Sequence, residues 1–257
     1  MEITEIFKDG LQYPFNDIQK FVILGLIFCL TFISFFLLAF AGDSTSAIIL
    51  LLIIMIINLI IGIYTSGYYF NVVENTIKKN DELPEFELVN TLINGLKVIL
   101  IGIVYGIVPF IFTILIAFLS GAIYNLGQIM TIVINGDTVP EALALSTLTS
   151  FTIVILLSAL VSLIFGLLSL IAIARAADKE KLSAAFEFGE IINAIKQIGI
   201  VDFIIWFILF AIIICVISMI SSIFMSIPIL GLLIMVIIEA YILIFSGRVL
   251  GLLYNEA

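Results

Sequence analysis

Six long apolar segments dominate the sequence, at residues 21–41, 47–67, 98–120, 150–174, 203–225 and 229–249. A helix needs about 20 predominantly apolar residues to cross the hydrocarbon core of a bilayer. Backbone polar groups cannot stay unpaired in hydrocarbon, so runs of this length separated by charged or turn residues are expected to be helices. The sequence therefore predicts an all-α fold, a polytopic membrane helix bundle with six transmembrane helices in a single membrane domain over residues 1–257.

The composition supports this class and excludes several functions. Hydrophobic residues make up 63% of the chain and charged residues only 11%, unlike a soluble domain. The chain has no histidine, which excludes histidine-dependent nucleophiles and metal sites, and no acidic pair is clustered within a span. The net charge of −9 offers no basic surface to a phosphate backbone. We expect no enzymatic activity, no metal or cofactor and no nucleic-acid partner, and membrane lipids are the predicted partners.

The basic residues predict the orientation in the cell membrane. Cytoplasmic loops are enriched in lysine and arginine. All 10 basic residues fall on the side of the spans that holds both termini, whereas the opposite loops carry Asp43, Asp137 and Glu141. We therefore expect a multi-pass protein of the cell membrane with both termini in the cytoplasm.

An amphipathic stretch precedes each odd-numbered span, and the three stretches end in similar words: FNDIQK, INGLK and INAIK. Asparagine suits a helix break because its side chain can cap exposed backbone N–H groups. We predict three parallel hairpin repeats, at about residues 1–80, 84–181 and 182–254, each introduced by a cytoplasmic interfacial helix. The polar segment 121–149 either extends two spans beyond the bilayer or forms a small interfacial lid. A helix is expected to start at Thr138, with Pro140 in its first turn.

The stretch GYYFNVVENTIKKNDELPEFELVNTLINGLKVILIG closes a span at Gly67-Tyr68 and opens an amphipathic helix at LPEF. In this it resembles the archaeal membrane proteins grouped as domain of unknown function 4013, over nearly the whole chain. The resemblance implies a membrane protein with six spans or a similar number and no assigned activity. It supplies no catalytic or binding residue.

Glu239 is the acidic residue placed deepest in a predicted span. It precedes Arg248 by nine residues, or roughly 13 Å at 1.5 Å per helical residue. Asn58 lies at a comparable depth in the second span and is the best candidate partner. Such a group serves either as a proton or cation relay, or as a neutral acid that bonds two helices together.

The three asparagine and lysine pairs form a second candidate site. If the repeats close around a pseudo-threefold axis, the pairs converge into a cytoplasmic ring that could bind an anion or a lipid phosphate. Alternatively, each asparagine caps a helix break and each lysine follows the cytoplasmic bias. The ring would consist of Asn16, Lys20, Asn94, Lys97, Asn193 and Lys196.

Together these features predict a non-enzymatic membrane protein that binds or transports a small or lipid-like solute. The alternative is a structural or assembly factor of the membrane without transport activity. A polar cavity that reaches Glu239 would favour the first hypothesis.

Overall fold

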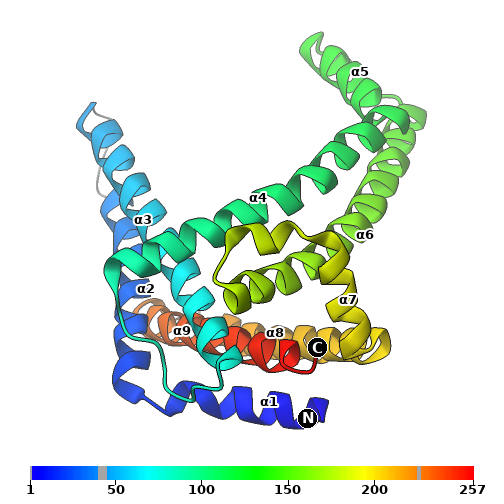
Figure 1. The fold of residues 1–257 in the computed structure, drawn as a ribbon. Helices are drawn as coiled ribbons and strands as arrows, with labels where there is room; N and C mark the ends of the chain where they lie inside the picture. The colour runs from blue at the N-terminus through cyan, green and yellow to red at the C-terminus, as the bar shows by residue number, and fades with distance from the viewer. Residues whose placement is uncertain (1, 40–44, 225–226) are drawn as a thin grey trace. The chain divides into compact units, whose positions relative to one another are not determined.

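The structure is a computed structural model that describes residues 2–39, 45–224 and 227–257. Every regular element within these residues is helical, as predicted (Figure 1). Two short 3-10 helices, η1 (Tyr13–Phe15) and η2 (Leu182–Phe186), accompany the α-helices. The α-helices are α1 (Ile3–Gln12), α2 (Ile18–Ala39), α3 (Thr45–Ile77), α4 (Leu88–Leu119), α5 (Ala122–Ile134), α6 (Glu141–Lys179), α7 (Phe188–Ile198), α8 (Ile200–Phe224) and α9 (Pro228–Tyr254).

The helices confirm a multi-pass membrane protein. In the described part of the chain, five helices are long and apolar enough to cross a membrane, namely α3, α4, α6, α8 and α9. A sixth span results if residues Ile3–Phe15 and Ile18–Thr31, which meet at 80°, are counted as one. The predicted span ends at residues 41 and 225 and the turn at residues 42–44 lie outside the described residues.

The chain forms two compact units, which we describe separately. The first unit comprises Met1–Ile99 and Ile171–Ala257, and the second, here called the hairpin unit, comprises Leu100–Leu170. Helices α4 and α6 each contribute to both units.

Helix α9 is the centre of the first unit, because α1, α2, α3 and α8 all pack against it. Gly247 and Gly251 of α9 face α3 so closely that added Cβ atoms would lie 2.7 Å from Val72 and 2.6 Å from Thr76. Small residues at this spacing allow helices to approach through their backbones. A cluster of buried side chains surrounds the contact: Tyr13, Phe21, Leu24, Tyr68, Val72, Leu83, Ala240 and Ile244.

Helices α3 and α4 cross at two glycines. A Cβ atom on Gly67 would lie 1.7 Å from the carbonyl oxygen of Thr91, and one on Gly95 would lie 1.8 Å from that of Ile63. Only glycine permits backbones to approach this closely. The crossing fixes the C-terminal part of α3 beside the first turns of α4.

The entrances to the odd-numbered spans differ, which corrects the prediction of an asparagine at each break. Asn16 does lie at the bend between η1 and α2. Asn94 instead lies inside the continuous helix α4, where Gly95 packs against α3. Asn193 lies inside α7, and the break before α8 falls at Gly199, whose φ of +96° favours glycine. The predicted separate helix before the span is therefore present as α1 and α7 but merged into α4, and the threefold repeat stays a prediction.

The hairpin unit contains a helix that the sequence pattern did not reveal. Helix α5 follows Gly121, which adopts a φ of +78°, and ends before Gly136 with a φ of +79°. The hydroxyl of Ser150 in α6 donates to the carbonyl of Ser120, 2.8 Å away, at the turn before α5. Helix α6 begins at Glu141, three residues after the predicted start at Thr138.

Candidate functional site

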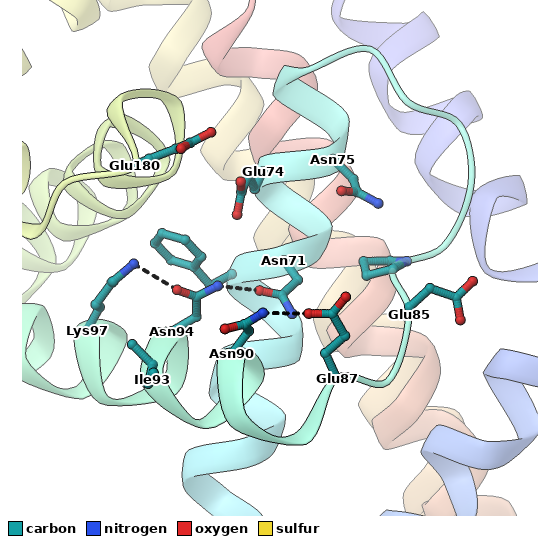
Figure 2. Close-up of a pocket in the computed structure, with 12 residues that line it drawn as sticks. Asn71, Glu74, Asn75, Glu85, Glu87, Asn90, Ile93, Asn94, Lys97 and Glu180 are labelled. Atoms are coloured by element: carbon teal, nitrogen blue, oxygen red, sulfur yellow. Dashed lines mark hydrogen bonds between the residues drawn. The ribbon is translucent and has the colours of Figure 1, made fainter.

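A polar cavity of about 520 Å³ lies in the first unit, beside the crossing of α3 and α4 (Figure 2). Helix α3 contributes Phe70, Asn71, Glu74 and Asn75 to its wall. The remaining wall comes from the loop before α4, the first turns of α4 and the residue after α6: Pro84, Glu85, Glu87, Asn90, Ile93, Asn94, Lys97 and Glu180.

Hydrogen bonds hold the loop between α3 and α4 against the bundle. The buried hydroxyl of Tyr68 donates to the carbonyl of Pro84 at 3.2 Å, and that of Tyr13 donates to the carbonyl of Glu82 at 2.9 Å. The amide of Asn75 also donates to the carbonyl of Glu82, at 3.3 Å. The loop wall of the cavity is therefore fixed by side chains of α3 and η1.

A row of hydrogen bonds leads from the cavity into the helix crossing. The ammonium of Lys97 donates to Oδ1 of Asn94 at 2.8 Å, and Nδ2 of Asn94 donates to Oδ1 of Asn71 at 2.7 Å (Figure 2). Nδ2 of Asn71 then donates to the hydroxyl of the fully buried Thr91 at 3.1 Å. Lys97 also lies over the ring of Phe70, 5.4 Å from its centroid. These contacts orient both carboxamides before any solute enters.

Four carboxylates line the cavity, and three of them have lysine partners. Lys78 contacts Glu74 at 2.5 Å and Glu180 at 2.6 Å, while Lys20 contacts Glu85 at 2.7 Å. Glu87 accepts instead from Nδ2 of Asn90, at 2.6 Å. Glu87 therefore keeps a negative charge that no lysine neutralises within the described residues.

The pair of Lys78 and Glu180 shifts the titration of both groups. The hydrogen bonds that Lys78 donates to Glu180 and then to Glu74 raise the pKa of Lys78 above its ordinary value. The hydrogen bond from Lys78 lowers the pKa of the Glu180 carboxyl. Both groups are therefore charged at neutral pH, and they connect the end of α3 with the end of α6.

The cavity suits a small solute that forms several hydrogen bonds. Its four carboxamides both donate and accept, and its carboxylates accept hydrogen bonds from hydroxyl or ammonium groups. An anion would meet four carboxylates and one lysine. Among the described residues, no group of three or more histidine, cysteine, aspartate or glutamate side chains is arranged to hold a metal ion.

The structure brings together only part of the predicted cytoplasmic ring. Asn94 and Lys97 line the polar cavity, and Lys20 reaches it through Glu85. Asn16 contacts the carbonyl of Asp81 at 3.5 Å, outside the cavity wall. Asn193 lines a different cavity of about 230 Å³ with Arg175 and Tyr254. Lys196 is exposed on α7.

Glu239 and Asn58 both lie at partly buried positions, in α9 and α3. Nδ2 of Asn58 donates to the carbonyl of Ile54 one turn earlier in α3, at 2.9 Å. Its Oδ1 atom is buried and has no hydrogen-bond partner in the described part of the chain. The predicted bond between Asn58 and Glu239 is therefore not formed, and the polar cavity described above is not lined by Glu239.

Sequence reasoning missed Asn71 and Glu74 as site residues. Both follow the apolar part of a predicted span. Polar side chains are expected at this membrane boundary in any spanning helix, so they do not by themselves indicate a binding site. Glu87, Asn90 and Asn94 were visible as the polar face of an amphipathic stretch. One feature of the sequence could have indicated the site: polar residues end one span and also begin the helix that leads into the next span.

The fold and this cavity together define a class: a multi-pass helical membrane protein with a polar pocket where α3 and α4 meet. Within that class, the chain belongs to the family described as Protein of unknown function (DUF4013), whose model matches residues 49–226. This confirms the family seen in the sequence over these residues. Searches among curated proteins and among solved structures return no match.

Proposed function

We propose that this protein is a non-enzymatic membrane protein that binds a small, hydroxyl- or ammonium-bearing solute in the polar cavity. One observation carries the proposal: two carboxamides, of Asn71 and Asn94, are held in place on facing helices of a cavity of about 520 Å³. That volume is within the range of small-molecule pockets, which use a few oriented polar groups for specificity.

The charges of the wall support this class of solute over an anion. Glu87 has no lysine partner in the described part of the chain, whereas Lys97 already donates to Asn94 and lies over Phe70. An ammonium or hydroxyl group can donate hydrogen bonds to the Glu87 carboxylate and to the side-chain oxygen of Asn90 without displacing an ion pair. A phosphate would have to compete with Asn94 for Lys97.

Binding can be measured on the full-length chain in a mild neutral detergent, with choline, spermidine, glycerol and inorganic phosphate as separate probes. A ligand that binds only the folded state raises the melting temperature in a concentration-dependent way. We expect a saturable rise with at least one of the first three probes and none with phosphate.

Two variants test whether this binding uses the cavity. Asn94→Leu removes the hydrogen bond that Oδ1 of Asn71 accepts from Asn94, and it should weaken binding of the probe about tenfold, a typical effect of one lost polar contact. Asn125→Leu, in the hairpin unit, is the control and should bind like the wild type. A response to phosphate alone, or an Asn94→Leu protein that binds every probe normally, would contradict the proposal.

The proposal also places both termini and the polar cavity on the cytoplasmic side, as the distribution of basic residues predicts. Single cysteines can test this in a chain whose own Cys29 and Cys215 have been replaced. A membrane-impermeant thiol reagent added to intact cells should label a cysteine at Thr138 and not one at Lys79 or Lys181. The reverse labelling pattern would show the opposite orientation.

A structural or assembly role without transport is the second candidate, and helix α5 favours it. This apolar helix is too short to span a bilayer and exposes large side chains, among them Tyr124, Met130 and Ile134. Such a surface is typical of protein or membrane contacts. Saturable probe binding that Asn94→Leu weakens would favour the solute-binding function, whereas the absence of binding in a folded protein would favour assembly.

A further inference from the structure

A second groove lies in the first unit, between α1 and α8, and it is amphiphilic. Its volume is about 350 Å³. The apolar side consists of Phe7 and Leu11 of α1 together with Leu209 and Ile213 of α8. The polar side consists of Thr4, Lys8 and Gln12, which lie four residues apart and therefore share one face of α1.

Lys8 differs from several other basic residues of this protein because no carboxylate in the described part of the chain is paired with it. It is exposed and forms no ion pair with any described residue, in contrast to Lys20, Lys78 and Arg248. The neighbouring Asp9 is already held by Arg248, and Glu5 accepts a hydrogen bond from the backbone of Glu2 at the start of α1. In a chain of net charge −9, the groove is lined by one cation and no carboxylate.

The position of α1 relative to α2 suits a membrane surface. The two helices meet at 80°, the geometry expected where a surface helix turns into a span. The buried side chains of α1, including Ile6 and Phe7, face the bundle, while the row from Thr4 to Gln12 faces outward. The groove therefore presents hydrogen-bond donors and a positive charge next to an apolar floor.

We propose that the groove between α1 and α8 binds an anionic phospholipid. Lys8 and Gln12 hold the headgroup phosphate, and Phe7, Leu11, Leu209 and Ile213 contact the start of one acyl chain. The absence of a carboxylate from the lining favours an anionic headgroup over one that carries an ammonium. This site is separate from the polar cavity and does not depend on the proposed solute.

The chain contains a built-in reporter for this site. Trp206 is its single tryptophan and stacks on Phe7, with 6.3 Å between ring centroids. Phe7 and Leu209, three residues after Trp206, both line the groove. Phospholipids with brominated acyl chains quench tryptophan fluorescence at short range, so a lipid in the groove should quench Trp206.

The experiment reconstitutes the full chain in phosphatidylcholine nanodiscs with increasing fractions of brominated phosphatidylglycerol or brominated phosphatidylcholine. One lysine near the membrane surface contributes about 1 kcal/mol toward anionic lipid, which corresponds to about a fivefold preference. Wild-type Trp206 should therefore reach half-maximal quenching at about a fivefold lower fraction of the anionic lipid. Lys8→Gln should remove this preference, and Lys8→Arg should retain it.

Two further variants separate a site from general charge attraction. Lys181→Gln removes an exposed lysine outside the groove and should keep the preference. Ile213→Phe fills the groove and should reduce quenching by the anionic lipid to the level of phosphatidylcholine. Equal quenching of the wild type by both lipids, an unchanged preference in Lys8→Gln, or an equal loss in Lys181→Gln would overturn the proposal.

Discussion

Gly67 of α3 and Gly95 of α4 bring the backbones of two membrane helices into direct contact. A Cβ atom on Gly95 would lie 3.1 Å from the backbone nitrogen of Gly67 and 1.8 Å from the carbonyl oxygen of Ile63. The same crossing places Asn94 within 2.7 Å of Asn71. The shape of the polar cavity therefore depends on glycine at both positions, because the methyl group of an alanine would push the two helices apart.

Gly67→Ala or Gly95→Ala should separate the helices, because backbone cannot yield as a flexible side chain can. We expect each to lower the free energy of unfolding by about 2–3 kcal/mol, the upper range of overpacking effects. Denaturation in mixed detergent micelles measures this change. Gly62→Ala in α3 and Gly102→Ala in α4 are matched controls, since their Cβ atoms would meet nothing within 4 Å. Equal effects of all four substitutions would show that the crossing has no special role.

Arg248 joins α1, α9 and the loop before α4. Its guanidinium is bidentate on Asp9, at 2.6 and 3.1 Å, and contacts Asp81 at 2.7 Å. The Arg248 side chain is only 6% exposed, whereas that of Asp9 is 39% exposed and that of Asp81 is 76% exposed.

Loss of Asp9 should therefore cost more stability than loss of Asp81. We expect Asp9→Asn to lower the free energy of unfolding by about 1–2 kcal/mol, because it weakens a bidentate bond to a buried charge. Asp81→Asn should cost less than about 1 kcal/mol, as for exposed pairs. Denaturation of both variants measures the two losses of unfolding free energy. A larger loss in Asp81→Asn than in Asp9→Asn would contradict this prediction.

The pair of Lys78 and Glu180 predicts a pH dependence with a definite sign. The Glu180 pKa is lowered in the folded state, so its contribution is present above the unfolded pKa and is lost as pH falls through the folded pKa. The Lys78 pKa is raised, so its contribution is present below the unfolded pKa and is lost as pH rises through the folded pKa.

Melting temperatures of the wild type and Glu180→Gln should therefore differ at neutral pH and converge at both extremes. The convergence at acid pH lies below the ordinary glutamate pKa of 4.5, and that at alkaline pH lies above the ordinary lysine pKa of 10.5. The difference should also shrink in high salt, since both groups are exposed. A difference that is constant across the whole pH range would exclude this origin.

The sequence predicts the helices of this fold well because each span has a strong local signal. Apolar runs of span length depend on nearby residues alone, as does the turn before α6, and α6 begins within three residues of the predicted start at Thr138. The sequence does not predict α5 as a separate helix, because Asn125, Gly127 and Gln128 interrupt its apolar residues and leave open whether the segment extends the spans or forms a lid.

The candidate site was harder to predict because it depends on contacts between distant residues. A sequence repeat and a charge bias predict Asn94 and Lys97 as site residues, yet both line the cavity because Gly95 packs on Gly67. No local pattern identifies Asn71 as the partner of Asn94, 23 residues later. Depth in the membrane alone predicts Asn58 as the partner of Glu239, and depth does not specify which face of a helix a side chain occupies.

Glu239 provides the test of transport. It is a partly buried residue of α9, between the buried Val236 and Ala240. An ionised carboxylate within the bilayer costs about 2.5 kcal/mol or more, so the group is expected to be neutral unless water or a cation reaches it. Glu239→Gln keeps the shape and hydrogen bonding of the neutral acid but cannot release a proton.

The two roles of Glu239 therefore give different results in proteoliposomes. If Glu239 only bonds helices together, Glu239→Gln should fold and move protons or choline like the wild type, and Glu239→Leu should lose about 1 kcal/mol of stability. If Glu239 is a relay, Glu239→Gln should fold normally and lose the flux that the wild type shows with a pH-sensitive dye or labelled choline. Flux that persists unchanged in Glu239→Gln, or a wild type without flux of either probe, would eliminate the relay.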